Sequence, residues 1–450
     1  MNIIIVGAGT VGFSLAEHFS SLRHHITLIE QNQLICEQLN SKLDVSAIAS
    51  IGSAPAALEE AGIKTADMLI AVTPSDEINL LTCNFAMQNG VEKRIARVKS
   101  DVYTTNLSCI NLEQLGVTHV IETEREVVKT ILQYVELPGV LETASFQSDS
   151  IYLRGYQVTE DMPIAYKNLA EIKQMAKTPP MLVVIIMRDN KSLPATGDQK
   201  LLPGDKIVTI MPADSFNAFR TLINRKPAKL VKVVISGDSL TAIHLAEALK
   251  PFCERVILVD PNEEHGKMAA SMLDGVEVLH GDSTNSEILQ EIQVEHADYF
   301  IAAAKDTEDN IMSCLLAKYE GAKRVIAIRD DERYNELFGS LGIDYIITPQ
   351  QITVNSIIEK IQTVSLGVYL KLKTADIEVI YLKAEGKNSV VGRSLRELEK
   401  VFKKSIIIGC IVRNNSVIIP DGSTIIEDKD EAIVLCNKKY IQMVSKHFSR

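Results

Sequence analysis

Three glycines near the start of the chain, Gly7, Gly9 and Gly12, have the spacing of a dinucleotide-binding turn. They follow the apolar run Ile3–Val6 and precede an amphipathic stretch, the context in which this spacing is informative. Gly7 permits a tight turn, Gly9 lacks the Cβ that would block a pyrophosphate, and Gly12 lets the helix pack closely on the strand. Free N–H groups at the helix start would face the phosphates; the alternative is a glycine-rich turn without a ligand.

A carboxylate follows at the end of the second apolar run, where Glu30 stands 18 residues after Gly12. A carboxylate at this place accepts hydrogen bonds from ribose hydroxyls and repels a 2′-phosphate. The sequence therefore predicts NAD(H) rather than NADP(H), although the adenosine phosphates ATP and ADP carry the same free ribose.

Further ligand contacts are expected where later strands end, because open α/β sheets bind ligands at the carboxyl ends of their strands. Gly52 and Ser53 follow the third expected strand, and Thr73 and Pro74 follow the fourth. Arg97 ends the fifth and offers a guanidinium to a phosphate; the alternative for it is a surface ion pair.

No group of residues predicts catalysis. A dehydrogenase needs a proton donor or base near the nicotinamide, and the nine histidines form no recognisable constellation. His18, His24 and His25 are better explained as surface or core residues. No Walker A motif, serine elbow or His-x-x-x-His pair is present, so we expect neither a catalytic residue nor a metal site.

Composition places the chain among globular proteins. Of its 450 residues 46% are hydrophobic and 23% charged, and tryptophan is absent. A net charge of −11 argues against nucleic acid as a partner. Seven cysteines without a Cys-x-x-Cys pair indicate reduced thiols rather than disulfides or zinc. Without a signal peptide or an apolar run long enough to span a bilayer, the sequence predicts a cytoplasmic protein whose membrane contact is peripheral.

Short apolar runs alternate with amphipathic helical stretches in the first part of the chain. This alternation predicts a doubly wound parallel sheet with right-handed crossovers, a Rossmann-like α/β domain. The expected strands are Ile3–Val6, His25–Ile29, Ser46–Ala49, Met68–Val72, Arg94–Val98 and Val120–Ile121.

The chain then repeats itself. The opening NIIIVGAGTVGFSLAEHF has a counterpart in KVVISGDSLTAIHLAEAL, with Gly237 lying 230 residues after Gly7. Asp260 corresponds in the same way to Glu30, and Asn310 corresponds to Asn79 at an offset of 231. Similarity at such a period indicates two copies of a unit of about 225 residues.

Each copy continues into a smaller part with period-2 segments, such as Ile151–Val158, Met181–Met187 and Lys206–Ile210, which predict a small α+β domain. Residues 226–229 are the expected linker. The expected domains are 1–122 and 227–348 (Rossmann-like), 123–140 and 349–371 (helices crossing between them), and 141–226 and 372–450 (small C-terminal domains).

The second copy keeps the acid but loses the glycines. Ser239 replaces the second glycine and Ala242 the third, and Asp238 adds negative charge beside the phosphate path. A vestigial, structural role is one interpretation of this copy. The other is a mononucleotide or adenosine held against Asp260.

At this point GAGTVG with Glu30, the segments LEEAGIKTADMLIAVTPSDEINLL and IARVKSDVY, and the later LLPGDKIVTI together resemble the regulator-of-K⁺-conductance family, RCK or KTN. The duplicated order of nucleotide domain and small domain strengthens the resemblance, which covers nearly the whole chain. It implies a regulatory subunit rather than an enzyme, which binds NAD(H), with ATP and ADP as further ligands. The nucleotide contacts that the resemblance implies are Gly7, Ala8, Gly9, Thr10, Val11, Glu30, Gly52, Ser53, Thr73, Pro74 and Arg97, with Asp260 as the acid of the second copy.

The resemblance further implies a peripheral protein on the inner face of the cell membrane. Four tandem chains would form a homo-oligomeric ring under a potassium-translocating membrane subunit of the TrkH type. The helical stretches 124–135 and 352–361 are candidate elements for passing a ligand signal between lobes, or else plain core. The competing hypotheses are an NAD-dependent oxidoreductase with tandem Rossmann domains and a scaffold whose nucleotide is permanently bound.

Overall fold

The computed structural model describes residues 1–104, 111–147, 149–175, 181–189, 191–193, 195–224, 230–329, 341–361, 368–372, 377–386, 389–402 and 406–448. The chain folds into two compact units, Met1–Val135 with Ala228–Lys360, and Glu136–Pro227 with Ile361–Arg450. Each unit therefore combines one part from each copy of the repeat. The expected linker at 226–229 lies outside the described residues.

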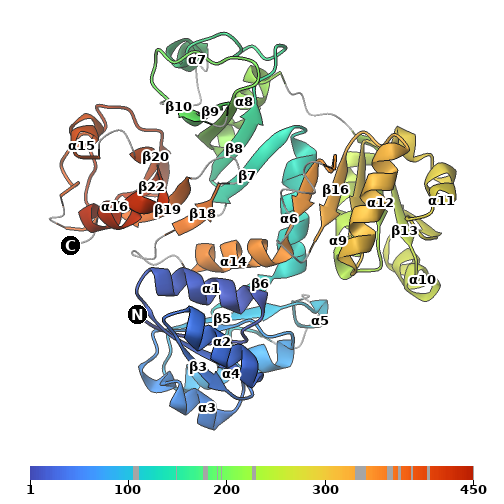
Figure 1. Ribbon diagram of the computed structural model, residues 1–450, viewed down its shortest axis with the longest axis horizontal. Coiled ribbons are helices and arrows are strands. Elements are labelled where there is room, and N and C mark those ends of the chain that lie inside the picture. Colours follow the sequence, from blue (N-terminus) through green and yellow to red (C-terminus); the bar gives the residue numbers. More distant parts are fainter. Residues whose placement is uncertain are drawn as a thin grey trace. The chain divides into compact units, whose positions relative to one another are not determined.

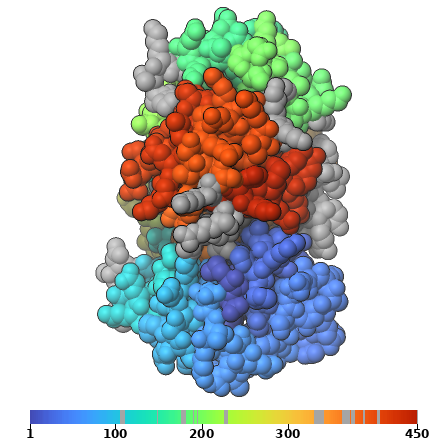
Figure 2. Space-filling view, turned by 90° about the vertical axis from the view of Figure 1, so that its left-hand side faces the viewer, coloured from blue at the N-terminus to red at the C-terminus, as the bar shows by residue number. Residues whose placement is uncertain are grey.

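The first lobe, residues 1–122, is built on a six-stranded parallel sheet in the order β3-β2-β1-β4-β5-β6 (Figure 1). Ile3 of β1 pairs with Ile26 of β2 on one side and with Met68 of β4 on the other, so the strand order reverses between β1 and β4. The outer surface of this lobe is drawn in blue to cyan in Figure 2. The strands are β1 (Asn2–Val6), β2 (His25–Glu30), β3 (Ser46–Ala49), β4 (Met68–Ala71), β5 (Lys93–Val98) and β6 (His119–Glu122).

Helices cover both faces of this sheet, which is why its central strands are apolar on both sides. All four residues of β4 are buried, and the core of one face joins Val6 and Leu69 to Leu58 and Cys83 on the helices. The helices are α1 (Thr10–Ser21), α2 (Gln33–Lys42), α3 (Pro55–Glu60), η1 (Ile63–Thr65), α4 (Asp76–Gln88) and α5 (Asp101–Thr104).

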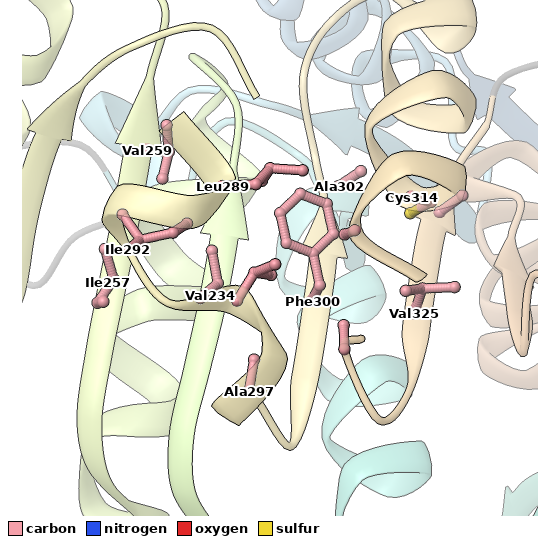
Figure 3. Close-up of a cluster of buried hydrophobic side chains, with 14 of the residues drawn as sticks. Val234, Ile257, Val259, Leu289, Ile292, Ala297, Phe300, Ala302, Cys314 and Val325 are labelled. Atoms are coloured by element: carbon pink, nitrogen blue, oxygen red, sulfur yellow. The ribbon is translucent and has the colours of Figure 1, made fainter. Parts of the chain in front are cut away.

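The second lobe, residues 230–348, repeats this sheet in the order β14-β13-β12-β15-β16-β17. Figure 3 shows part of its core, where the Phe300 ring lies among aliphatic side chains that include Leu289 and Ala302. Its elements are β12 (Leu230–Ser236), α9 (Leu240–Leu249), η3 (Lys250–Phe252), β13 (Cys253–Asp260), α10 (Glu263–Met272), β14 (Glu277–His280), α11 (Ser286–Glu291), η4 (Val294–His296), β15 (Tyr299–Ala302), α12 (Thr307–Tyr319), β16 (Val325–Ile328) and β17 (Tyr345–Ile347).

Two further helices connect the lobes, α6 (Thr123–Glu136) after the first sheet and α14 (Pro349–Lys360) after the second. Tyr134 of α6 packs its ring against Tyr345 of the second lobe, at 4.7 Å between ring centroids, and its carbonyl accepts a hydrogen bond from the Tyr299 hydroxyl. The other helix, α14, packs against α1 of the first lobe, and its Lys360 donates a hydrogen bond to the Val120 carbonyl at 2.7 Å. Each helix thus continues one lobe and packs against the other.

The second unit contains two five-stranded antiparallel sheets, in the orders β10-β9-β11-β8-β7 and β18-β19-β22-β20-β21. One apolar core includes Leu153 and Ile210 of the first sheet together with Val379 and Leu435 of the second. The strands are β7 (Val140–Phe146), β8 (Ile151–Gln157), β9 (Leu182–Arg188), β10 (Lys191–Leu193), β11 (Lys206–Pro212), β18 (Val368–Lys371), β19 (Glu378–Lys383), β20 (Ile406–Arg413), β21 (Ser416–Ile418) and β22 (Glu431–Cys436). The helices are α7 (Leu169–Met175), η2 (Ala213–Ser215), α8 (Phe216–Leu222), α15 (Leu395–Phe402), η5 (Lys438–Tyr440) and α16 (Ile441–Phe448).

Two Rossmann-like parallel sheets in tandem, each followed by a small α+β domain, are what the sequence predicts, and this fold class is confirmed. Among the described residues, no helix is both long enough and apolar enough to cross a bilayer.

Candidate functional site

A cleft of about 930 Å³ opens where the strands of the first sheet end, beside the point at which the strand order reverses. Ligands of open α/β sheets bind at this position. Of the residues expected from the sequence, the cleft is lined by Gly7, Gly9, Thr10, Val11, Glu30, Gly52, Thr73, Pro74 and Arg97. Ala8, Gly12, Ser53 and Asp260 do not line it.

The turn after β1 has the geometry that the glycine spacing predicts. Gly7 adopts φ +97°, a conformation that favours glycine, and its N–H donates to the Ile29 carbonyl at 2.9 Å. A Cβ on Gly12 would stand 1.9 Å from the Gly7 carbonyl oxygen, so only glycine allows α1 to start this close to the turn. Both residues are thus required by the fold itself.

Gly9 is different, because nothing in the chain requires it to be glycine. Its φ is −63°, and a Cβ built on it would meet no atom within 4 Å. Gly9 is the N-cap of α1, and no side chain caps this helix. Uncapped N–H groups at a helix start, with open space where a side chain would stand, fit the close approach of a phosphate.

Glu30 closes the opposite side of the turn. Its two carboxylate oxygens accept hydrogen bonds from the Ala8 and Asn32 N–H groups, each at 2.9 Å. A carboxylate has about four lone-pair sites, so Glu30 retains acceptor capacity toward the cleft that it lines. Ala8 therefore contributes to the site by orienting Glu30 with its backbone N–H, and its side chain does not line the cleft.

The segment after β4 is held by a buried amide that the sequence analysis noticed only as part of the repeat. Asn79 is fully buried; its Oδ1 accepts from the Thr73 N–H and hydroxyl, and its Nδ2 donates to the carbonyls of Thr73 and Arg97. One side chain thus fixes the ends of β4 and β5 relative to each other. Gly52 packs against Val6, where a Cβ would stand only 2.2 Å from Val6 Cγ1.

Arg97 is half-buried at the end of β5. Its Nε donates to the Thr123 hydroxyl at 3.1 Å, and that oxygen lies 3.0 Å from the Thr353 hydroxyl of α14. The guanidinium that lines the cleft is therefore tied to the first residue of α6.

Glu124, the second residue of α6, also lines the cleft, and the sequence analysis missed it. Burial raises the pKa of its carboxyl group, and the nearby charges of Arg97 and Lys99 oppose this rise. In sequence it is one acid among several at the start of a helix. Only the position of that helix at the cleft distinguishes it.

The second lobe contributes its own residues to the same cleft, among them Ser239, Lys305 and Gln350. The Ser239 hydroxyl caps α9 by accepting from the Ala242 N–H at 3.2 Å, and it also donates to the Ala303 carbonyl. Lys305 forms an ion pair with Asp238 at 2.8 Å. The helix start that is open in the first lobe is therefore capped in the second.

Asp260, the counterpart of Glu30, is fully buried. One of its oxygens accepts from the Asn262 N–H at 2.8 Å, and the other bonds Nδ1 of His265 on α10. None of the residues of β13 or β14 lines the cleft.

Within the described part of the chain, no cluster of three or more histidine, cysteine, aspartate or glutamate side chains is placed to hold a metal ion. The histidines the sequence analysis set aside lie outside the cleft lining.

Family models match the lobes that build this cleft. The TrkA-N domain model matches residues 3–123 and 233–349, and the TrkA-C domain model matches residues 383–449. A curated relative from Azorhizobium caulinodans, "Trk system potassium uptake protein TrkA", is 31% identical over all of this chain and 98% of its own length. The chain belongs to the TrkA family. This confirms the resemblance found in the sequence.

Other family members are similar over their full length as well. A Halomonas elongata protein of the same name is 30% identical over all of this chain and 98% of its own length. A "Trk system potassium uptake protein TrkA homolog" from Archaeoglobus fulgidus is 28% identical, with both chains fully covered.

Solved structures share the fold at low sequence identity. The crystal structure of the GsuK RCK domain has a TM-score of 0.60 at 17% identity, covering 99% of this chain and 94% of that one. The structure titled "GsuK channel bound to NAD" has a TM-score of 0.62 at 17% identity and covers 99% and 78%. The fold of the chain, two Rossmann lobes and two small domains, is therefore a known one.

Proposed function

We propose that this chain is the nucleotide-sensing regulatory subunit of a potassium uptake system, and that it gates a membrane K⁺-translocating subunit of the TrkH type. The relatives named for Trk potassium uptake and the full-length similarity to them support this proposal. The observation that carries its nucleotide part is Gly9, whose missing Cβ leaves open space at an uncapped helix start beside Glu30.

The proposed ligand is NAD(H), with ATP or ADP as further ligands of the same site. The pyrophosphate would lie against Gly7 to Gly12, and the ribose hydroxyls would donate to Glu30. Gly52, Thr73, Pro74 and Arg97 would complete the contacts, with Arg97 as the phosphate cation. Structures of GsuK titled as bound to NAD and to ADP are in keeping with this ligand class.

The proposed output is a change of shape rather than a chemical reaction. A ligand shifts a protein between two conformations only if it binds them with different affinities. In this chain the cleft is lined by both lobes, and α6 and α14 cross between them, so closure on a nucleotide would alter the packing of the lobes. The proposed assembly is a ring of four chains on the inner face of the membrane.

The second candidate function is an NAD-dependent oxidoreductase. Glu124, an acid with a raised pKa in the cleft, is the observation in its favour. Turnover of NADH with any substrate would support this alternative.

Calorimetric titration with NAD⁺, NADH, ATP and ADP tests the nucleotide part of the proposal. Binding should be lost in Gly9→Asp, which places a carboxylate in the phosphate space, and weakened about tenfold or more in Glu30→Ala. Gly9→Asp leaves the packing of the turn intact, because a Cβ at Gly9 meets no atom within 4 Å. Glu30→Ala also removes the acceptor of the Ala8 and Asn32 N–H groups, so its folding is checked by urea unfolding. Unchanged affinity in both variants would contradict this site.

A further inference from the structure

The two lobes share one fold but differ at the place where a nucleotide's adenosine would lie. In the first lobe the cleft extends over the ends of β2 and β3, where it is lined by Glu30, Ile35 and Ser50. In the second lobe it reaches only the turn after β12 and the ends of the later strands. The cleft therefore does not extend over the adenosine side of the second lobe.

In the second lobe the carboxylate that would accept hydrogen bonds from a ribose, Asp260, is hydrogen-bonded to groups of the chain itself. Glu30 and Asp260 use one oxygen identically, for the N–H group two residues further along the chain. The other oxygen of Glu30 accepts from the Ala8 N–H beside the cleft, whereas that of Asp260 bonds the His265 imidazole. Asp260 has no exposed surface, and His265 is the group that stands against it.

The helix start on the phosphate side lines the cleft, but it is capped by a side chain of the second lobe. Ser239 stands where Gly9 is open, and its hydroxyl takes the N–H of Ala242 that a phosphate would need. Asp238, the counterpart of Ala8, adds a carboxylate that is paired with Lys305. Both changes oppose an anion at this turn.

From these contacts we propose that the second lobe is closed to nucleotides by its own side chains, with His265 in the place of the ribose, so that each chain takes one nucleotide. The inference rests on the proposed function of the first lobe and defines its stoichiometry. The second lobe would then contact the nucleotide of the first lobe through the residues with which it lines the shared cleft.

The repeat indicates which substitution tests the role of His265. The residue that corresponds to His265 in the first lobe is Ile35, which lines the cleft. Ile35→His would introduce an imidazole five residues after Glu30, as His265 stands five residues after Asp260. We expect this variant to bind ADP at least tenfold more weakly than Ile35→Leu, which keeps an aliphatic side chain at the same position of the cleft lining. Equal affinities of the two variants would overturn the role of the imidazole.

The stoichiometry is measured by calorimetric titration of the full chain with ADP and, separately, with NADH. The expected results are one site per chain in the wild type, none in Gly9→Asp, and one site of unchanged affinity in Asp260→Asn. Two sites in the wild type, or one remaining site in Gly9→Asp that Asp260→Asn removes, would overturn this inference alone. No binding by the wild type would overturn the proposed function and this inference with it.

Discussion

Thr123, the first residue of α6, and Thr353 in α14 face each other with their hydroxyl oxygens 3.0 Å apart. Thr123 also accepts from Arg97, and Thr353 donates to the Pro349 carbonyl at 2.8 Å. A short chain of hydrogen bonds therefore runs from a cation of the candidate nucleotide site to both helices that cross between the lobes.

This contact predicts that binding and response separate in Thr123→Val. The methyl group that replaces the hydroxyl is similar in size but breaks both side-chain hydrogen bonds of Thr123. Nucleotide affinity should stay within about threefold, because Thr123 contributes no charge. The response of the K⁺ flux to the nucleotide should fall, because coupling between two sites is typically worth only about 1–3 kcal/mol and one lost buried hydrogen bond is a large part of that. The measurement is ligand-dependent K⁺ flux alongside calorimetry; a response equal to that of the wild type would contradict the relay.

Gly9 and Gly12 should respond in opposite ways to alanine. In Gly9→Ala the Cβ meets no atom of the chain, so the free energy of unfolding should change by less than about 1 kcal/mol while nucleotide affinity falls about tenfold. In Gly12→Ala the Cβ would stand 1.9 Å from the Gly7 carbonyl oxygen, and the lobe should lose about 2–3 kcal/mol of stability.

Urea unfolding and calorimetry on the two glycine variants check this contrast. A Gly9→Ala chain that is as destabilised as Gly12→Ala would show that the open space at Gly9 is structural rather than reserved for a ligand.

A half-buried histidine on α1, His18, should make the first lobe sensitive to acid. Burial, together with repulsion by His24, lowers the pKa of His18 from 6.5 to about 4. The unfolded chain then binds more protons than the folded one between these values, so stability is complete above pH 6.5 and is lost as pH falls toward 4. The loss should amount to about 2 kcal/mol, and His18→Gln should flatten the profile. Urea unfolding between pH 7.5 and pH 4 measures it; parallel profiles would contradict the assignment.

Glu124 should act in the opposite direction. Its pKa is raised above the ordinary 4.5 because burial disfavours the charged carboxylate. The folded chain then binds more protons than the unfolded one above pH 4.5, so the contribution of this group to stability falls as pH rises. We expect Glu124→Gln to be more stable than the wild type at pH 7 and to approach it at pH 4. Glu126→Gln, two residues further along α6 and outside the cleft lining, is the matched control.

Most strands of the first lobe could be predicted from the sequence, because the pattern of apolar residues that indicates a strand is local. The expected strands of the first lobe differ from the observed ones by a residue or so at their ends, and β3 has the expected bounds, Ser46–Ala49. In the small domain β8, β9 and β11 were foreseen, but β7 (Val140–Phe146) was not, because it directly follows α6 without an alternating pattern.

The side-chain partners of the site were not readable in this way. The bond from His265 to Asp260 depends on the two-residue turn that sets α10 against the end of β13. The bond from Arg97 to Thr123 joins the end of β5 to the first residue of α6, which only the sheet brings together. Glycine spacing, by contrast, predicted both the turn and the separate roles of its glycines, with Gly12 close to the Gly7 carbonyl and Gly9 facing open space.

The most direct test of the regulatory role is K⁺ flux through a TrkH-type membrane subunit reconstituted with this chain, measured with and without NADH. The wild type should change the flux when NADH is added, and Gly9→Asp and Glu30→Ala should assemble with the membrane subunit but give no NADH-dependent change. A normal response to NADH in both variants would contradict the account.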